Sequence, residues 1–585
     1  MTDWGATHDR KKMLEAGCDL EMPGDTAVCR RWILEGIEDK SLSQEALDAA
    51  VRNVLRAVDR FEPTISPSPE FEDHDPLALK IALSSAVLLQ NDGILPLKKG
   101  EPLIVLGDLF AKMRYQGSGS SMIHPRNLVT PKVAFDEAKA PYLYARGYSS
   151  SIEEVDPSLE EEAKRLLKGN EKTCLLFLGL TDLIESEGAD RESYALPANQ
   201  VSLLKLALAS NKKVVIVLFG GSPIAMSDLL EASAILDMRL PGEQGGKAAV
   251  QLLFGEVSPS GKLSETIPLR YEDVPYGKEF SKSPIEVYKE DVYVGYRYYG
   301  SFGKDVAFPF GHGLSYAKFS YSDFLADGDE KEILFRVKVK NEGDMQASEV
   351  VELYVSPPGK QVHRPFMELK GFAKVHLAPG EEKEISLKIK TEDLRYYSEN
   401  RKRFVLEPGA YRFYLGKDCL SPILALNIDL QGEATQEDRF ASEVYGRDPT
   451  SLSDEDFERA SGKKIPEAAP RFPITMESRF QDLASSKFLG RILYKAVLSV
   501  AHKQRKKGER MEEGAAKDNV LKGAKFLERI LDSNSLTTMS MSAGTSCPYH
   551  FALGFREFAN GHPFKGIASF LRRIKAPKLP KEEKE

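Results

Sequence analysis

A carboxylate beside a large aromatic side chain opens the sequence, as Asp3 followed by Trp4. Sugar chemistry uses this combination, because an acidic nucleophile can attack the anomeric carbon while a flat apolar ring packs against the pyranose. The same Asp-Trp-Gly tripeptide also suits a turn in which Asp3 caps a helix. The pair is a candidate nucleophile and sugar-binding wall only if other parts of the chain point the same way.

A second set of carboxylates lies in residues 183–191, Leu-Ile-Glu-Ser-Glu-Gly-Ala-Asp-Arg, just after an apolar run. A general acid for glycoside cleavage needs burial or neighbouring negative charge to hold its proton near neutral pH. Glu185 and Glu187, two positions apart, supply such surroundings. The alternative is an acidic surface loop that Arg191 neutralises.

A chain of 585 residues is too long for a single hydrophobic core and suggests three or four domains. The carboxylates must therefore be positioned by more than one domain. The formal net charge of -8 and the lack of nucleic-acid motifs argue against nucleic-acid binding. Five scattered cysteines indicate neither a disulfide framework nor a CxxC metal site, and favour a reducing, cytoplasmic setting. The longest apolar run, 214–219, is far short of the roughly 20 residues that cross a bilayer.

Residues 78–272 alternate between short apolar runs and helical patterns. We expect buried strands at 103–106, 174–179, 214–219 and 234–236, and helices at 200–209 and 246–254. This alternation is typical of a mostly parallel, doubly wound sheet with helices on both faces. Because ligands gather beyond the carboxyl ends of such strands, the loops 115–121 and 182–191 are where a site is expected.

Other patterns flank this region. Residues 43–61 carry an apolar stripe that predicts a packed amphipathic helix, and a proline-rich, acidic linker follows at 65–77. A short helix that carries Ala82, Ala86, Leu88 and Leu89 is expected next, followed by a turn at 91–93. After a connecting segment at 273–318, alternating apolar and polar residues over 319–432 predict a small immunoglobulin-like β-sandwich.

The last part, 433–585, is polar and then helical. Its segment 487–505 is basic and partly apolar, which would suit a membrane surface or a protein partner. Because Glu512 and Glu513 soon balance the charge, we favour a solvated helix that covers another domain, and we expect no membrane association.

An ordered series of motifs from residue 1 to about 430 resembles glycoside hydrolase family 3 β-glucosidases. The matching segments are 3–6 (DWGA), 16–24 (AGCDLEMPG), 85–91 (SAVLLQN), 114–121 (RYQGSGSS), 185–191 (ESEGADR), 241–246 (PGEQGG), 254–255 (FG), 259–263 (PSGKL) and 308–316 (FPFGHGLSY). Any one of them is dispensable, but the ordered set is specific.

The resemblance implies a (β/α)8 barrel, an α/β sandwich and a fibronectin type III-like domain, with the active site between the first two. Residues 1–64 would be the C-terminal remnant of the barrel, with Asp3 as nucleophile at a strand's carboxyl end and Trp4 as a wall of the sugar site. Glu187 is our first choice for the acid/base and Glu185 the second. The substrate-binding residues implied by the motifs are Arg114, Tyr115 and Ser120.

The implied reaction is retaining hydrolysis of terminal β-D-glucosyl residues from a β-glucoside or oligosaccharide, with no cofactor or metal. A (β/α)8 barrel takes about 250 residues, whereas barely 60 precede the linker, so we expect a truncated sequence with impaired activity. The alternatives are a β-xylosidase, a non-catalytic carbohydrate-binding fragment, and an interaction protein built on the basic tail. A β-N-acetylhexosaminidase is disfavoured by the loop 185–191, and homo-oligomerisation stays open.

Overall fold

The computed structural model describes residues 1–23, 26–61, 71–187, 190–191, 193–210, 213–280, 282–283, 285–359, 362–434, 439–467, 471–512, 514–542, 547–575 and 577. The chain divides into two compact units. Unit 1 contains Met1–Pro69, Gly188–Asp190 and Ala469–Glu585, and unit 2 contains Glu70–Glu187 and Arg191–Ala468. Each unit is described by itself.

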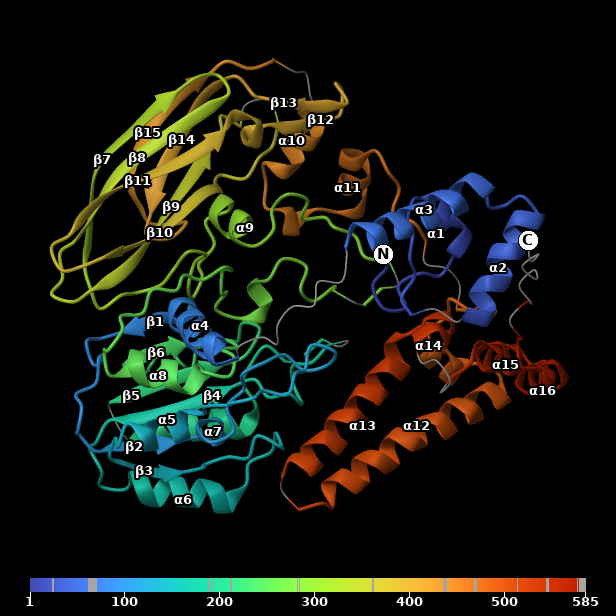
Figure 1. Cartoon of the computed structure of the whole chain (residues 1–585), viewed down its shortest axis with the longest axis horizontal. Coiled ribbons are helices and arrows are strands. Elements are labelled where there is room, and N and C mark those ends of the chain that lie inside the picture. The colour runs from blue at the N-terminus through green and yellow to red at the C-terminus, as the bar shows by residue number, and fades with distance from the viewer. Residues whose placement is uncertain are drawn as a thin grey trace. The chain divides into compact units, whose positions relative to one another are not determined.

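The N-terminal part of unit 2 is a six-stranded sheet in the order β1-β6-β5-β4-β2-β3 (Figure 1). All neighbouring strands pair in parallel except β1 and β6, which are antiparallel. The strands are β1 (Val87–Asn91), β2 (Leu103–Leu106), β3 (Tyr142–Ala145), β4 (Cys174–Gly179), β5 (Val214–Phe219) and β6 (Ala234–Asp237). The mostly parallel sheet expected from the alternating pattern is confirmed.

Five helices accompany this sheet: α4 (Phe71–Ser85), α5 (Pro131–Glu137), α6 (Pro157–Leu167), α7 (Ala198–Ser210) and α8 (Gly245–Leu253). Helix α8 contacts α4 and α5, whereas α6 contacts α7, as expected for two helical layers on a doubly wound sheet. The expected linker at 65–77 overlaps residues 62–70, which lie outside the described part, and α4 already begins at Phe71.

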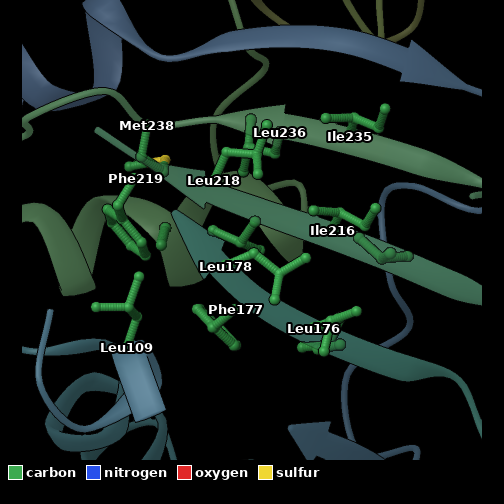
Figure 2. Close-up of a cluster of buried hydrophobic side chains, with 14 of the residues drawn as sticks. Leu109, Leu176, Phe177, Leu178, Ile216, Leu218, Phe219, Ile235, Leu236 and Met238 are labelled. Atoms are coloured by element: carbon green, nitrogen blue, oxygen red, sulfur yellow. The ribbon is translucent and has the colours of Figure 1, made fainter. Parts of the chain in front are cut away.

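The central strands are buried along their whole length, as the uninterrupted apolar runs require. Every residue of β2, β4, β5 and β6 is buried. Figure 2 shows side chains of neighbouring strands meeting in one cluster, among them Leu176, Ile216 and Ile235. This core fixes the strand ends, so the loops that leave them have a rigid base.

The short helix expected through Ala82, Ala86, Leu88 and Leu89 forms only in its first part, because α4 contains Ala82 and ends at Ser85. The expectation is wrong for Leu88 and Leu89, which lie in β1 and pair with the outer side of β6. A run of four apolar residues fits a helix turn and a buried strand equally well, and here the free edge of β6 decides between them.

The C-terminal part of unit 2 holds the β-sandwich predicted from period-two alternation. One sheet has the order β10-β9-β14-β15 and the other β11-β8-β7, and their inner faces share one apolar core. The strands are β7 (Phe319–Gly328), β8 (Glu332–Asn341), β9 (Ala347–Ser356), β10 (Glu368–Leu377), β11 (Glu382–Lys390), β14 (Gly409–Gly416) and β15 (Pro422–Leu430), with a separate pair β12 (Tyr396–Ser398) and β13 (Arg403–Val405). Helices α9 (Tyr296–Ser301), α10 (Arg439–Tyr445) and α11 (Asp454–Ser461) complete the unit.

Unit 1 joins the two ends of the sequence. Its N-terminal helices are α1 (Arg10–Glu15), α2 (Thr26–Glu38) and α3 (Gln44–Arg60), and its C-terminal helices are α12 (Phe488–Glu509), α13 (Ala515–Ser533), α14 (Leu536–Ser542), α15 (Tyr549–Ala559) and α16 (Pro563–Leu571). Within it, Trp4 and Met22 form a parallel bridge between two extended segments. No described helix is both long and apolar enough to cross a membrane.

Helix α3 forms where residues 43–61 predicted it, with the Ser43 hydroxyl capping its first turn. The expectation that its apolar stripe is packed is wrong for the second half of the helix. Ala50 is buried against Leu14 and Leu42, but Leu55 and Val58 are 60% and 68% exposed. Helical periodicity shows which residues share a face, but not whether another element covers that face.

Candidate active site

The loops expected to carry chemistry in unit 2 leave neighbouring strands at the point where the sheet changes direction. From β2 the chain crosses to β3 on one side, and it then returns to place β4 on the other side of β2. The loop after β2 and the loop after β4 therefore start side by side at the carboxyl edge. This is the place where doubly wound sheets bind ligands.

Glu187, in the loop after β4, reaches Ser120, in the loop after β2. The Ser120 backbone N–H donates to Glu187 Oε2 at 2.6 Å, and the Ser120 hydroxyl donates to Oε1 at 3.0 Å. The backbone N–H of Glu187 donates to the Ser118 carbonyl at 2.9 Å. The two loops are thus joined at the carboxylate itself, which is still exposed to solvent.

A glycine makes this approach possible. Gly119 has φ of +119°, and a Cβ built there would lie 2.5 Å from both Cβ and Oε2 of Glu187. No side chain fits at that distance, since carbon atoms in contact lie about 3.5–4.0 Å apart. The loop 115–121 was expected to border a site, and Gly119 is the residue that lets its backbone approach Glu187.

Glu185 has different surroundings from Glu187, although only one residue separates them. Its Oε2 accepts from the Gly221 N–H at 2.7 Å, and its Oε1 accepts from the Ser222 hydroxyl. Arg114 Nη2 lies 3.8 Å from Oε2. The Glu185 side chain is only 18% exposed, so protein groups surround it on most sides.

Arg114 connects the loop after β2 to the loop after β4. Its side chain is 4% exposed and pairs with Asp182 through Nη1. Its Nε donates to the Gln116 carbonyl at 2.8 Å, and Nη2 donates to the Glu185 carbonyl at 3.2 Å. A buried guanidinium with these partners holds backbone and carboxylates in fixed positions.

Tyr115 lies half-buried beside these groups. Its hydroxyl accepts from Gln116 Nε2 at 2.9 Å, and its carbonyl accepts from the Gly242 N–H at 3.0 Å. Burial raises the pKa of the phenol, and the nearby negative charge of Asp182 adds to that shift. The hydroxyl therefore stays protonated and can donate a hydrogen bond at neutral pH.

In unit 1, Asp3 and Trp4 occupy the first extended segment. Asp3 Oδ1 accepts from the Trp4 N–H at 2.6 Å, and both side chains are exposed, Trp4 by 61%. The segment is held by the adjacent one, because the Thr2 N–H donates to the Leu20 carbonyl and the Gly5 N–H to the Met22 carbonyl, each at 2.9 Å. An exposed carboxylate next to an exposed indole is what a sugar-binding wall with a nucleophile requires.

The C-terminal helices pack against the segment that contains Asp3 and Trp4. Gly5 has φ of +67° and lies against α14, so that a Cβ there would meet the Ser542 hydroxyl at 2.0 Å. His8 pairs with Glu477 and contacts the Thr538 hydroxyl at 3.0 Å through Nε2. The sequence predicted helices in the tail, and it left open what they cover.

Trp32 on α2 extends this contact. Its ring meets Tyr549 edge-on at 5.2 Å, and the Arg10 guanidinium lies 5.1 Å from its centroid. Arg10 is itself buried and forms a two-pronged ion pair with Glu21. The segment that bears Asp3 therefore has its own rigid support.

The structure brings Ser120 against Glu187, and Arg114 and Tyr115 into the loop cluster with Glu185. Asp3 and Trp4 belong to unit 1, and Gly188 and Ala189 of the acidic loop lie outside the described residues. The sequence analysis missed Gly221 and Ser222. They lie in the loop that follows the apolar run 214–219, so the rule that drew attention to the loops after β2 and β4 applied to them as well.

Comparison with known proteins gives matches over both domains of unit 2. Residues 86–316 match the glycosyl hydrolase family 3 C-terminal domain, and residues 349–419 match the fibronectin type III-like domain. The first covers the doubly wound sheet with its site loops, and the second covers most of the β-sandwich.

Similar proteins come from several bacteria. Thermostable β-glucosidase B of Acetivibrio thermocellus is 35% identical over 497 residues, which are 83% of this chain and 65% of that protein. The exo-α-(1→6)-L-arabinopyranosidase of Bifidobacterium breve is 35% identical over 462 residues, or 76% of this chain and 61% of that protein. The chain thus spans less than two thirds of the length of these curated relatives.

Among solved structures, the GH3 β-glucosidase of Bifidobacterium adolescentis superposes with a TM-score of 0.69 at 34% sequence identity. The match covers 77% of this chain and 68% of that structure. The shared fold, the domain matches and this level of identity agree with the ordered motifs. The chain belongs to glycoside hydrolase family 3.

Proposed function

We propose that this protein hydrolyses terminal β-D-glucosyl residues from β-glucosides by a retaining, double-displacement mechanism. Asp3 is the nucleophile, and Glu187 is the general acid/base. Trp4 forms an apolar wall of the sugar site, and Ser120 positions Glu187. The substrate class follows the activity of the β-glucosidases to which the chain is similar.

The observation that carries the choice of Glu187 is its contrast with Glu185. Glu185 is engaged by Gly221, Ser222 and Arg114 and is mostly buried, so it has little capacity left for a substrate. Glu187 is held on one side by Ser120 and is open to solvent on the other. A group that protonates a leaving oxygen must be fixed and reachable at once.

In the first step, an Asp3 carboxylate oxygen attacks the anomeric carbon while the Glu187 carboxyl gives its proton to the glycosidic oxygen, which leaves as an alcohol. In the second step, Glu187 takes a proton from water, whose oxygen attacks the same carbon and displaces Asp3. Retaining enzymes perform this sequence with carboxyl groups about 5–5.5 Å apart. Neither step needs a metal or an organic cofactor.

We propose this activity for the part of the relatives that the chain spans, which is 65% of the Acetivibrio thermocellus β-glucosidase and 61% of the Bifidobacterium breve arabinopyranosidase. The parallel pairing of Trp4 with Met22 supports the proposal that residues 1–64 correspond to the end of a barrel. The five free cysteines support a reducing compartment such as the cytoplasm.

The test is hydrolysis of 4-nitrophenyl β-D-glucopyranoside by the purified chain and by Asp3→Asn. The variant should fold as the parent does, because Asp3 is exposed, and it should lose the hydrolysis that the parent shows. A 2-deoxy-2-fluoro-glucoside should label the parent on the peptide that contains Asp3. Hydrolysis that Asp3→Asn leaves intact would refute the nucleophile assignment.

Glu187→Gln is the matching test of the acid/base, with Glu185→Gln as its control. Glu187→Gln should lower kcat most for substrates with poor leaving groups, and added azide should restore turnover of activated substrates. Glu185→Gln should act mainly on stability. If azide instead rescues Glu185→Gln, the two roles are exchanged.

A pentopyranosidase is the second candidate, because the Bifidobacterium breve arabinopyranosidase is as similar to this chain as the Acetivibrio β-glucosidase is. Ratios of kcat/KM for aryl β-D-glucoside, β-D-xyloside and α-L-arabinopyranoside distinguish the candidates. Preference for a pentoside by more than about tenfold would replace glucose as the substrate.

A further inference from the structure

The C-terminal helices carry a charge that the proposed function does not use. Residues 471–575 contain 19 Lys and Arg against 9 Asp and Glu, whereas the whole chain has 80 against 88. From Phe558 to Lys581 there are six Lys or Arg and no acidic residue. Charge asymmetry of this kind indicates a surface that meets an anionic partner.

Helix α16 lies in this basic stretch and shows an apolar face to solvent. Phe564, Ile567 and Leu571 follow the i, i+3, i+7 spacing of one face and are 86%, 50% and 81% exposed. The opposite side of the helix is packed, because Gly566 is buried and Phe570 joins the core of the C-terminal helices. Helix α16 is therefore well packed on one side, and its apolar residues on the other side are exposed although the helix is held in place.

Basic side chains border this face. Lys565, Arg572 and Arg573 are all exposed, and none forms an ion pair with a carboxylate of the described residues. An apolar helix face edged by Lys and Arg is the pattern of helices that lie in the interface of an anionic bilayer.

A cavity of about 770 Å³ lies beside the first turn of α16 and the first turn of α12. Lys487, His562 and Lys565 line it together with Ser485. The one acidic side chain in its wall, Glu557, is paired with Arg556 at 2.6 Å. The cavity thus offers unpaired cationic groups to a ligand of negative charge.

Each cavity lysine adjoins an exposed phenylalanine in sequence. Phe488 follows Lys487 and is 68% exposed, and Phe564 precedes Lys565. In neither α12 nor α16 does the N-cap side chain accept a hydrogen bond from an N–H group of the first turn. A lipid phosphate in the cavity would therefore have cations around it and apolar side chains next to it, where acyl chains begin.

We propose that the surface formed by Lys487, Phe488 and residues 562–573 docks on an anionic phospholipid membrane. Its cavity takes the headgroup phosphate, and Phe564, Ile567 and Leu571 enter the acyl boundary. The charge excess selects anionic over zwitterionic lipid. This inference does not depend on the hydrolase activity, and it replaces the expectation from the sequence that the chain does not associate with membranes.

The test is flotation of the full chain with vesicles of phosphatidylcholine alone and with an equimolar mixture of phosphatidylcholine and phosphatidylglycerol. We expect binding to the mixture, little to phosphatidylcholine, and loss of binding at high salt. The variant Phe564→Glu/Leu571→Glu should bind at least about tenfold more weakly. Lys487→Glu/Lys565→Glu should lose the preference for anionic lipid.

The matched control is Phe372→Glu, which changes an exposed phenylalanine (67%) on strand β10 of the β-sandwich and should leave vesicle binding unchanged. Circular dichroism checks that each variant is folded. Equal binding to both vesicle types, or binding of inorganic phosphate without vesicle binding, would overturn the proposal. So would a dimer in solution that Phe564→Glu converts to a monomer, because a second copy would then be the occupant.

Discussion

Gly119 offers the sharpest test of how the acid/base is held. In Gly119→Ala the new methyl group would start 2.5 Å from Cβ and Oε2 of Glu187. An ordinary contact needs about 3.5 Å, so Glu187 must retreat by about 1 Å and lose one or both hydrogen bonds to Ser120. Misplacing a catalytic group by that distance costs on the order of 100-fold in rate. The positive φ of +119° adds about 1–3 kcal/mol of backbone strain.

The controls separate these two effects. Gly93→Ala imposes a similar backbone cost, since Gly93 has φ of +106°, but nothing lies within 4 Å of the new methyl group. Gly117→Ala places a methyl group in the same loop, where it meets only the Ser121 hydroxyl, at 2.7 Å. The assay is kcat for an aryl β-glucoside, with thermal unfolding measured in parallel. The reasoning fails if folded Gly119→Ala keeps kcat within about twofold of the parent, or if Gly93→Ala loses as much.

Two further predictions concern stability. Gly5→Ala combines an unfavourable φ of +67° with a contact to the Ser542 hydroxyl, so it should lower the free energy of unfolding by about 2–3 kcal/mol. Adding Ser542→Ala to the same chain should restore part of that loss, as measured by urea unfolding. If the stability changes of the two single variants simply add in the double variant, the contact is contradicted. Burial raises the pKa of Glu352 from 4.5 to about 7. Between these two pH values the folded state therefore keeps a proton on Glu352 that the unfolded state has released. The free energy of unfolding should thus fall by about 3 kcal/mol as pH rises from about 4.5 to above 7. Glu352→Gln keeps an acceptor for the Tyr354 hydroxyl and should flatten this dependence in unfolding experiments at pH 5 and 8; an unchanged slope would count against it.

Much of unit 2 could be predicted from the sequence, because its signals are local. The runs 174–179 and 214–219 become β4 and β5 with the expected bounds, since strands buried on both faces need uninterrupted apolar residues. The β-sandwich follows equally directly from alternation in segments such as 332–341. Loop positions then follow from strand ends, which is why the loops 115–121 and 182–191, which contain Ser120 and Glu187, were expected to carry a site.

What could not be predicted depends on contacts between distant residues. Glu185 differs from Glu187 largely because Gly221 and Ser222, some 36 residues later, supply donors to it. The exposed half of α3 and the strand conformation of Leu88 likewise depend on which element lies opposite. Periodicity carries no such information.

The same holds for the tail. The segment 487–505 was recognisable as helical and lies almost wholly in α12, but the support that α14 gives to Gly5 joins positions more than 500 residues apart. A sequence pattern can show that a helix has a face to bury. It does not show which segment receives that face.

The packing of Trp32 against Tyr549, and of Gly5 against Ser542, has a consequence for synthesis of the chain. A ribosome that adds about 5–20 residues per second needs roughly 20–100 s between making the first segment and its partner. During that time the side chains around Trp32 have no core to join and are open to chaperones and proteases. The candidate nucleophile therefore gains its rigid support only after helices α14 and α15 have been made, and a polypeptide released before that point would carry Asp3 on an unsupported strand.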